Sequence, residues 1–329
     1  MSSLIAWILR AIPFGTIIMY GALGETITEK SGNLNLGVPG IMYLGGFAGF
    51  ASAYYYENTV AEPVAILSIL LALVSALAAS ALGGLIYAFL TITLRANQNV
   101  TGLALTTFGM GVANFFGVFI LDGATYSAAP LANKAFAAKI PVLSGLGAVG
   151  QLLFSYGFLA YAAILLAVAL HWFFTRTRTG LNLRAVGENP ATADAAGINV
   201  TRYKYLATCA GAAICGLGGL YYVLDYNQGI WATTEQIQAL GWLALALVIF
   251  TTWKPLNAIW GAYLFGILYW LYQFLPSILG ISVSSAMTDL VQMVPYVVTI
   301  LVLIFVSMRR KKEDQPPAHL GLAYFREER

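Results

Sequence analysis

Residues 63–94 read PVAILSILLALVSALAASALGGLIYAFLTITL and contain no charged side chain. As a helix rising 1.5 Å per residue, this run would be about 48 Å long, whereas the hydrocarbon core of a bilayer is roughly 30 Å thick. A membrane helix of this length must therefore tilt, protrude from the bilayer or break.

The composition of the whole chain agrees with a membrane location. Of the 329 residues, 59% are hydrophobic and only 9% are charged, whereas soluble domains carry roughly 25% charged residues. The mean hydropathy is +0.76. We therefore expect an all-α protein, a polytopic bundle of transmembrane helices.

Windows of about 19 residues predict nine membrane spans, with eight or ten as open alternatives. We expect them to form one transmembrane domain, residues 1–308, followed by a tail, residues 309–329. The predicted spans are Leu4–Leu23, Leu36–Tyr56, Pro63–Leu94, Val100–Leu121, Leu152–Phe174, Tyr205–Leu224, Ile237–Thr252, Leu256–Leu275 and Leu290–Met308.

The positive charges predict the orientation, since cytoplasmic segments of membrane proteins are enriched in Lys and Arg. If the C-terminus is cytoplasmic, 14 of the 17 Lys and Arg residues fall in inner segments. Only Lys134 and Lys139 fall outside, and Arg10 lies within the first span. Nine spans then place the N-terminus outside.

Several functional classes are excluded by the composition. A formal charge of +3, carried by scattered basic residues, does not suit a nucleic-acid partner. Two histidines and two cysteines cannot build the usual metal clusters, and we expect neither a metal nor a cofactor. The chain has no Gly-x-x-x-x-Gly-Lys-Ser/Thr loop, so we expect no ATPase site and no catalytic residue of its own.

Residues 24–40, GETITEKSGNLNLGVPG, interrupt the apolar pattern with four glycines and a proline. Such backbone cannot face lipid, where its polar groups would have no partner. We expect a broken or re-entrant segment that lines a cavity, with an ordinary cytoplasmic loop as the alternative. The charges of Glu25, Glu29 and Lys30 are expected to be solvated or paired with one another. We therefore expect no intramembrane carboxylate pair of the kind that ion-coupled transporters use.

Residues 184–198, RAVGENPATADAAGI, predict a short cytoplasmic helix. Asn189 can cap the amides of Ala191 and Thr192, Pro190 suits the first helical position, and Gly197 suits a left-handed stop. A helix of about two turns is not stable alone in water. It therefore needs a docking surface, either a groove on another protein or this chain's own bundle.

Small residues four positions apart recur in the predicted spans. The pairs are Gly45 with Gly49, Ser80 with Gly84, and Cys215 with Gly219. Such pairs let helices approach closely, which predicts a tight bundle and nothing more specific.

Taken together, these motifs resemble a known family. The run from Gly24 to Gly37 is similar to the signature near the start of permease subunits of bacterial ABC importers, in the nucleoside and simple-sugar branch of the branched-chain amino acid/ribose permease family. The stretch Val186–Val200 resembles that family's coupling loop, here residues 175–204. The tail Pro317–Tyr324 is similar to nucleoside-type subunits in particular.

The resemblance implies partners and a location. It implies pairing with a second, homologous permease in the bacterial cytoplasmic membrane, docking on ATP-binding cassette subunits, and delivery of a small polar solute by an extracytoplasmic lipoprotein. The implied coupling residues are Gly187, Glu188, Asn189, Pro190, Ala193, Ala196, Gly197 and Ile198, and the predicted pathway residues are Asn33, Asn35, Gly37 and Gly40.

The chain departs from the family pattern at two places, and other functions stay open. Pro39 stands where an acidic residue is common, which leaves the solute undetermined, and Asp194–Gly197 matches the coupling consensus only approximately. The alternatives are a permease for branched-chain amino acids, an ion-coupled secondary transporter, and a structural or sensing membrane subunit.

Overall fold

The computed structural model describes residues 3–121, 129–141, 145, 147–231, 236–279, scattered positions between 289 and 308, and 314–325. Within these residues the regular structure is helical, with π-helical turns η1 and η3, and no strand occurs. The elements are α1 (Ser3–Lys30), α2 (Val38–Thr59), α3 (Ala65–Ala88), η1 (Phe89–Thr93), α4 (Gln98–Leu121), α5 (Pro130–Phe136), α6 (Gly147–Phe154), α7 (Phe158–Arg176), α8 (Arg178–Glu188), α9 (Pro190–Ala195), α10 (Val200–Tyr221), η3 (Tyr222–Tyr226), α11 (Gln236–Phe250) and α12 (Pro255–Leu279).

The predicted polytopic helical bundle is confirmed. Six helical segments are long and apolar enough to cross a membrane, and they contain α1, α3, α4, α7, α10 and α12. Two further predicted spans fall on α2, which has 22 residues, and on the shorter apolar α11, which has 15. The ninth predicted span, Leu290–Met308, lies largely outside the described residues, so the span count stays open.

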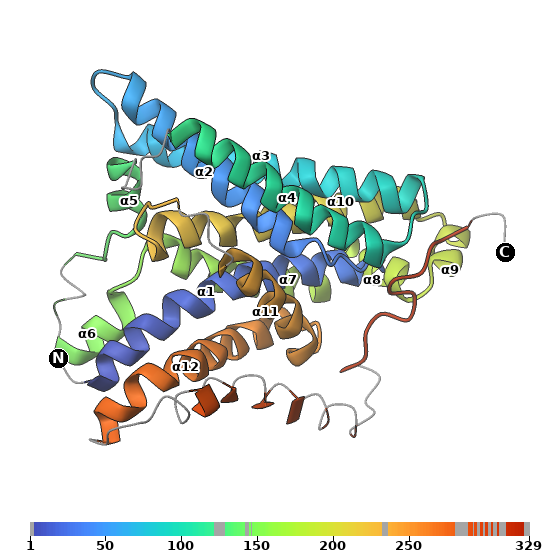
Figure 1. Cartoon of the computed structure of the whole chain (residues 1–329). Helices are drawn as coiled ribbons and strands as arrows, with labels where there is room; N and C mark the ends of the chain where they lie inside the picture. Colours follow the sequence, from blue (N-terminus) through green and yellow to red (C-terminus); the bar gives the residue numbers. More distant parts are fainter. Residues whose placement is uncertain are drawn as a thin grey trace.

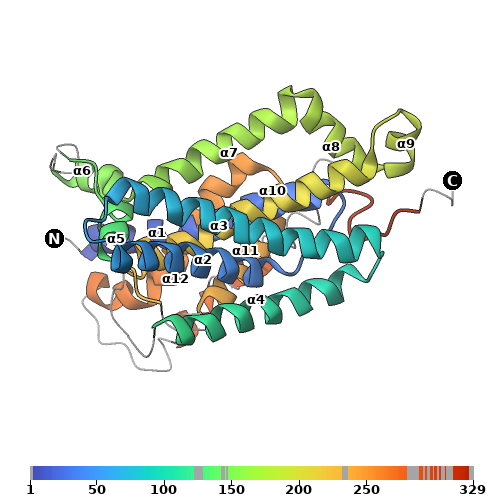
Figure 2. The same cartoon turned by 90° about the horizontal axis from the view of Figure 1, so that it is seen from above.

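The bundle is organised around two central helices, α1 and α10. Helix α10 packs against α1, α2 and α3, and α1 also packs against α11 and α12. Figures 1 and 2 show α5 and α6 at the end of the bundle where α1 begins. They show α8, α9 and residues 314–325 at the other end, which we call the tail end.

The peripheral helices expose apolar side chains. Val74 of α3, Phe119 of α4 and Leu165 of α7 are 62%, 76% and 70% exposed. A water-soluble protein rarely presents so many large apolar side chains together. These faces suit contact with lipid.

Small residues bring α2, α3 and α10 close together, as the sequence predicts. A Cβ atom added at Gly45 of α2 would lie 2.5 Å from the Cα of Gly216 in α10 and would also meet the hydroxyl of Ser80 in α3. A Cβ at Gly84 of α3 would lie 2.5 Å from the Cβ of Ala212 in α10. The backbones of these helices are therefore almost in direct contact.

Helix α1 extends further than the sequence predicts. Residues 24–30, expected to belong to the broken segment, are the last two turns of α1, and the irregular backbone is confined to residues 31–37. These turns lie against protein, because a Cβ at Gly24 would be 2.9 Å from the backbone nitrogen of Cys215 in α10. The glycine there serves helix packing and does not break the helix.

The long apolar run of residues 63–94 does not break. It forms one helical segment, Ala65–Thr93, of 29 residues, whose last turn is the π-helical η1. The chain reverses directly after it, at Arg95, where φ is +56°. This turn brings the start of α4 to the tail end of the bundle (Figure 2).

We predict that Gly45→Ala destabilises the bundle by about 1–3 kcal/mol, the usual cost of overpacking a core. The reason is that the new methyl group would meet the Gly216 backbone. The loss can be followed by thermal unfolding of the detergent-purified protein.

The matched control is Gly111→Ala in α4, because a Cβ at Gly111 meets no atom within 4 Å. This control should keep or slightly raise the unfolding temperature, since Ala favours a helix over Gly. Equal unfolding temperatures for both variants would contradict the tight α2–α10 contact.

Candidate functional site

The irregular segment between α1 and α2, residues 31–37, is buried at the tail end; we call it the α1–α2 break. Gly32 turns the chain with φ +88°, and its amide donates a 2.8 Å hydrogen bond to the carbonyl of Glu29. Asn33 and Asn35 are each 1% exposed. The break thus carries polar groups into the protein interior.

Side chains from three helices satisfy the backbone of the α1–α2 break. Buried backbone polar groups need such partners, because no water reaches them. The contacts are Leu34 N to Gln98 Oε1 (2.7 Å), Asn35 N to Glu25 Oε1 (2.9 Å), Thr106 Oγ1 to Leu36 O (3.0 Å) and Tyr87 OH to Leu34 O. Hydrogen bonds from α1, α3 and α4 therefore hold the break in a defined conformation.

The structure corrects the expectation for the acidic residues before the break. Glu25 and Glu29, expected to be solvated or paired with one another, are buried at 1% and 3% exposure. Glu25 accepts from the Asn35 amide, and Glu29 accepts from the indole N–H of Trp253. The sequence reasoning missed these buried carboxylates because it placed residues 24–30 in a broken or re-entrant segment and not in α1.

The polar segment after α7 folds as two short capped helices. The Thr177 hydroxyl accepts from the Gly180 amide at 3.0 Å and begins α8, which the sequence analysis did not predict. The Asn189 side chain accepts from the Thr192 amide at 2.9 Å and begins α9. Pro190 occupies the first turn of α9, and Gly197 follows it with φ +82°. The predicted short helix and its start and stop residues are present.

The residues predicted for coupling divide into a buried and an exposed group. Gly187, Pro190 and Ala193 are buried, and Ile198 is half-buried. The exposed members are Glu188, Asn189, Ala196 and Gly197. Helix α9 therefore presents a surface of small side chains, while its other face packs on the apolar cluster of Val186, Ala193 and Val200.

Helix α8 ends directly against the α1–α2 break. A Cβ at Gly187 would lie 3.2 Å from the amide nitrogen of Gly32 and would also meet the Lys30 carbonyl. Only a residue without a side chain permits this approach. The segment α8–α9 and the break are thus in direct contact.

Residues 314–325 are the described part of the predicted tail, and from here on 'the tail' means these residues. They join the elements of the tail end. The His319 amide donates to Gly187 O at 3.0 Å, and the Gly321 amide donates to Gly32 O at 3.1 Å. Other hydrogen bonds connect the tail to α9, α4 and the turn before α12. They are Tyr324 OH to Asp194 Oδ2 (3.0 Å), Gln98 Nε2 to Leu322 O (3.4 Å) and Lys254 Nζ to Asp314 Oδ1 (2.6 Å).

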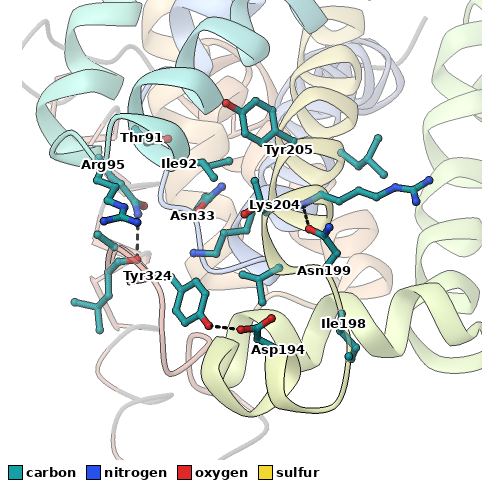
Figure 3. Close-up of a pocket in the computed structure, with 18 residues that line it drawn as sticks. Asn33, Thr91, Ile92, Arg95, Asp194, Ile198, Asn199, Lys204, Tyr205 and Tyr324 are labelled. Atoms are coloured by element: carbon teal, nitrogen blue, oxygen red, sulfur yellow. Dashed lines mark hydrogen bonds between the residues drawn. The ribbon is translucent and has the colours of Figure 1, made fainter. Parts of the chain in front are cut away.

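A cavity of about 720 Å³ lies between the tail, α9, the start of α10 and the turn before α4 (Figure 3). Lys204 of α10, 3% exposed, points into it. Nearby, burial and the Lys204 ammonium lower the pKa of His319 below its usual value. Neither Lys204 nor the tail contacts were predicted from the sequence, which carries no signal for contacts between such distant residues.

The predicted pathway residues occupy two environments. Asn33 lines the cavity, and its amide donates to the Thr208 hydroxyl at 3.0 Å. Asn35 accepts from the Gly37 amide at 2.9 Å. Gly37 and Gly40 allow α4 to approach, because a Cβ at Gly40 would lie 2.7 Å from the Cα of Thr106. All four lie on or directly after the break.

Comparisons with known proteins give a consistent result. A family model described as the branched-chain amino acid transport system / permease component matches residues 7–303. The guanosine ABC transporter permease protein of Bacillus subtilis is 32% identical over 94% of this chain and 92% of its own. The nucleoside ABC transporter permease protein of Lactococcus lactis is 31% identical over 88% of each chain. A Haloferax volcanii protein named "putative glucose ABC transporter permease protein" is 35% identical over 77% of this chain and 72% of its own.

We predict that Asn189→Ala weakens α9 by about 1 kcal/mol, the typical contribution of an N-cap side chain. Hydrogen exchange of the amides of residues 191–196, followed by mass spectrometry, should become roughly fivefold faster. Asn189→Asp, which keeps the capping oxygen, should exchange like the wild type. Unchanged exchange in Asn189→Ala would show that packing alone holds α9.

Proposed function

The chain belongs to the family described as the branched-chain amino acid transport system / permease component, and we propose from this membership that it is the membrane permease subunit of an ATP-driven importer of nucleosides or simple sugars. The names of the relatives mention nucleoside, guanosine or glucose, and they support this solute class. The single observation that carries the proposal is the match of the family over residues 7–303.

Helix α9 has the properties of a docking element for an ATP-binding subunit. It is shorter than the roughly 12–15 residues that an isolated helix needs, yet its cap, the cluster of Val186, Ala193 and Val200, and the Tyr324–Asp194 hydrogen bond hold it in place. Thr192, Ala195, Ala196 and Gly197 are exposed. A rigid element with a surface of small residues fits into a groove of a partner.

A force on α9 would reach the α1–α2 break by two routes. One route is direct, through Gly187 of α8, which contacts the backbone of Lys30 and Gly32. The other is the tail, which bonds to Gly187, Gly32 and Asp194. Closure of two ATP-binding subunits would then move the break together with α9. Coupling in this proposal is mechanical, and this chain contributes no catalytic residue.

The break would shape the solute pathway. Asn33, Asn35, Gly37 and Gly40 lie there, and amide and backbone groups suit an uncharged polar solute. The pathway would be completed by a second, homologous permease. An extracytoplasmic solute-binding lipoprotein would deliver the solute from the other side of the membrane.

The charges support a cytoplasmic tail end. Segments there carry Arg95, Arg178, Arg184, Arg202 and Lys254, as the positive-inside rule requires of a cytoplasmic face. The location proposed is the bacterial cytoplasmic membrane, with the start of α1 on the outer side.

The two buried glutamates of α1 are a feature that an ion-coupled secondary transporter would also have. Glu25 and Glu29 are two buried carboxylates one helical turn apart in the segment Ser3–Lys30, which is long and apolar enough to cross a membrane. Buried carboxylates of this kind mark proton or ion routes in secondary transporters. Their hydrogen bonds to Asn35 and Trp253 instead give them a structural role in holding the break. A permease for branched-chain amino acids is the other alternative within the family.

We predict that Ala195→Trp abolishes most of the solute-stimulated ATPase activity of the assembled complex, with at least a tenfold loss. The exposed indole would prevent α9 from entering a groove on the ATP-binding subunit. The measurement is ATPase activity together with co-purification of that subunit.

Ala148→Trp is the matched control, because Ala148 is exposed on α6, at the opposite end of the bundle (Figure 2). It should leave ATPase activity and co-purification unchanged. Normal ATPase stimulation in a well-folded Ala195→Trp complex would contradict docking through α9.

We also predict that uptake into proteoliposomes requires ATP, the ATP-binding subunits and the solute-binding lipoprotein. Labelled nucleoside, pentose and leucine would be compared, with nucleoside uptake expected to be highest. Uptake by this chain alone under a proton or sodium gradient would identify an ion-coupled carrier and overturn the proposal.

A further inference from the structure

The polar cavity at the tail end has features that solute transport does not explain. It lies among four segments that are distant in sequence, the α1–α2 break, the turn before α4, residues 194–206 and the tail (Figure 3). Its volume of about 720 Å³ is within the range of roughly 300–1,000 Å³ that small-molecule sites occupy. Neutral polar side chains of Asn33, Thr91 and Gln98 line one side.

Lys204 is the most unusual residue of this cavity. It is 3% exposed, and its ammonium group points into the space (Figure 3). Among the described residues, none forms a hydrogen bond or ion pair with the Lys204 side chain. Burial of an ammonium without a counter-charge is costly. An anion bound in the cavity would offset this cost.

The start of α10 adds a second feature that favours an anion. Residues 199–202 line the cavity, and α10 begins at Val200. The Asn199 side chain accepts from the Arg202 amide at 2.9 Å. The amides of Val200 and Thr201 meet no acceptor in the described part of the chain. Free amides and the helix dipole make such a helix start attractive to phosphate groups.

The charges around the cavity also favour an anion. Three cationic side chains line it, Arg95, Arg202 and Lys204, against one carboxylate, Asp194. The Asp194 carboxylate accepts from the Tyr324 hydroxyl at 3.0 Å, and the Arg95 guanidinium lies 4.5 Å from the centre of the Phe325 ring. The cavity therefore has an excess of positive charge as well as amide and hydroxyl donors.

We propose that this cavity binds the phosphate group of a small phosphomonoester from the cytoplasmic side, with Lys204 and the start of α10 as its ligands. The space is larger than a phosphate ion needs, and Tyr205 and Tyr324 line the remainder, where a sugar or base would lie. The ligand would contact both residues 194–202 and the break, and would hold them in the arrangement seen here. This role is independent of the transported solute, which is uncharged in the proposed function.

The first test measures binding to the detergent-purified full chain by thermal unfolding. Inorganic phosphate, ribose 5-phosphate and adenosine monophosphate should raise the unfolding temperature, whereas uncharged adenosine should raise it less or not at all. Lys204→Met should weaken binding of these phosphates at least tenfold. Lys134→Met, which removes an exposed lysine of α5, should bind like the wild type. Equal phosphate affinity of Lys204→Met and the wild type would overturn the proposal.

A second measurement needs no variant and so holds even if Lys204→Met fails to fold. Acetylation of the wild-type lysines by acetic anhydride is followed by mass spectrometry, with and without adenosine monophosphate. The nucleotide should slow acetylation of Lys204 at least fivefold and leave Lys134 unchanged. Equal Lys204 acetylation at saturating phosphate and nucleotide would overturn the proposal.

The phosphomonoester could be a soluble metabolite or a lipid headgroup, and a nanodisc experiment distinguishes them. Phosphatidylcholine discs with and without phosphatidic acid are compared, each with and without adenosine monophosphate. Lys204 protection by the nucleotide in pure phosphatidylcholine identifies a soluble ligand. Protection by phosphatidic acid alone identifies the lipid as the source of the same group. Absence of Lys204 protection in all discs would overturn the proposed phosphate site.

Discussion

Backbone that leaves the helical path inside a membrane protein must find a partner for each polar group within the protein. This constraint governs the α1–α2 break. Glu25, Gln98, Tyr87 and Thr106 supply the partners, and they come from α1, α4, α3 and again α4. The positions of three membrane helices at the tail end are therefore set by hydrogen bonds to a segment of seven residues, 31–37.

The same segment is the meeting point of two elements that do not span the membrane. Helix α8 reaches it through Gly187, and the tail reaches it through the Gly321 amide. Helix α9 is joined to both, by the chain itself and by Tyr324. Close-packed contacts have low compressibility, so a displacement of one backbone segment is passed on to the segment that it touches. This geometry joins α9, through α8 and the tail, to the buried α1–α2 break.

The sequence predicted the architecture because apolar runs and capping residues act locally. The runs located the helices, and Asn189, Pro190 and Gly197 located α9. Local patterns could not show that Gly24 packs against α10 and so keeps α1 helical through Lys30. Nor could they show that Lys204 lines a cavity with Asn33 or that the tail bonds to Gly32, since these residues are far apart in sequence. Helix α8 was missed because its polar composition resembles a loop.

The tail has a consequence for how the protein is made. Synthesis proceeds from the N-terminus, so the α1–α2 break enters the membrane early, while residues 314–325 follow every described helix. The Gly32 carbonyl and the Gly187 carbonyl therefore have no tail donors until all the described helices have been synthesised. A nascent chain that stalls before residue 314 therefore leaves these two carbonyls, and this end of the bundle, without the tail contacts.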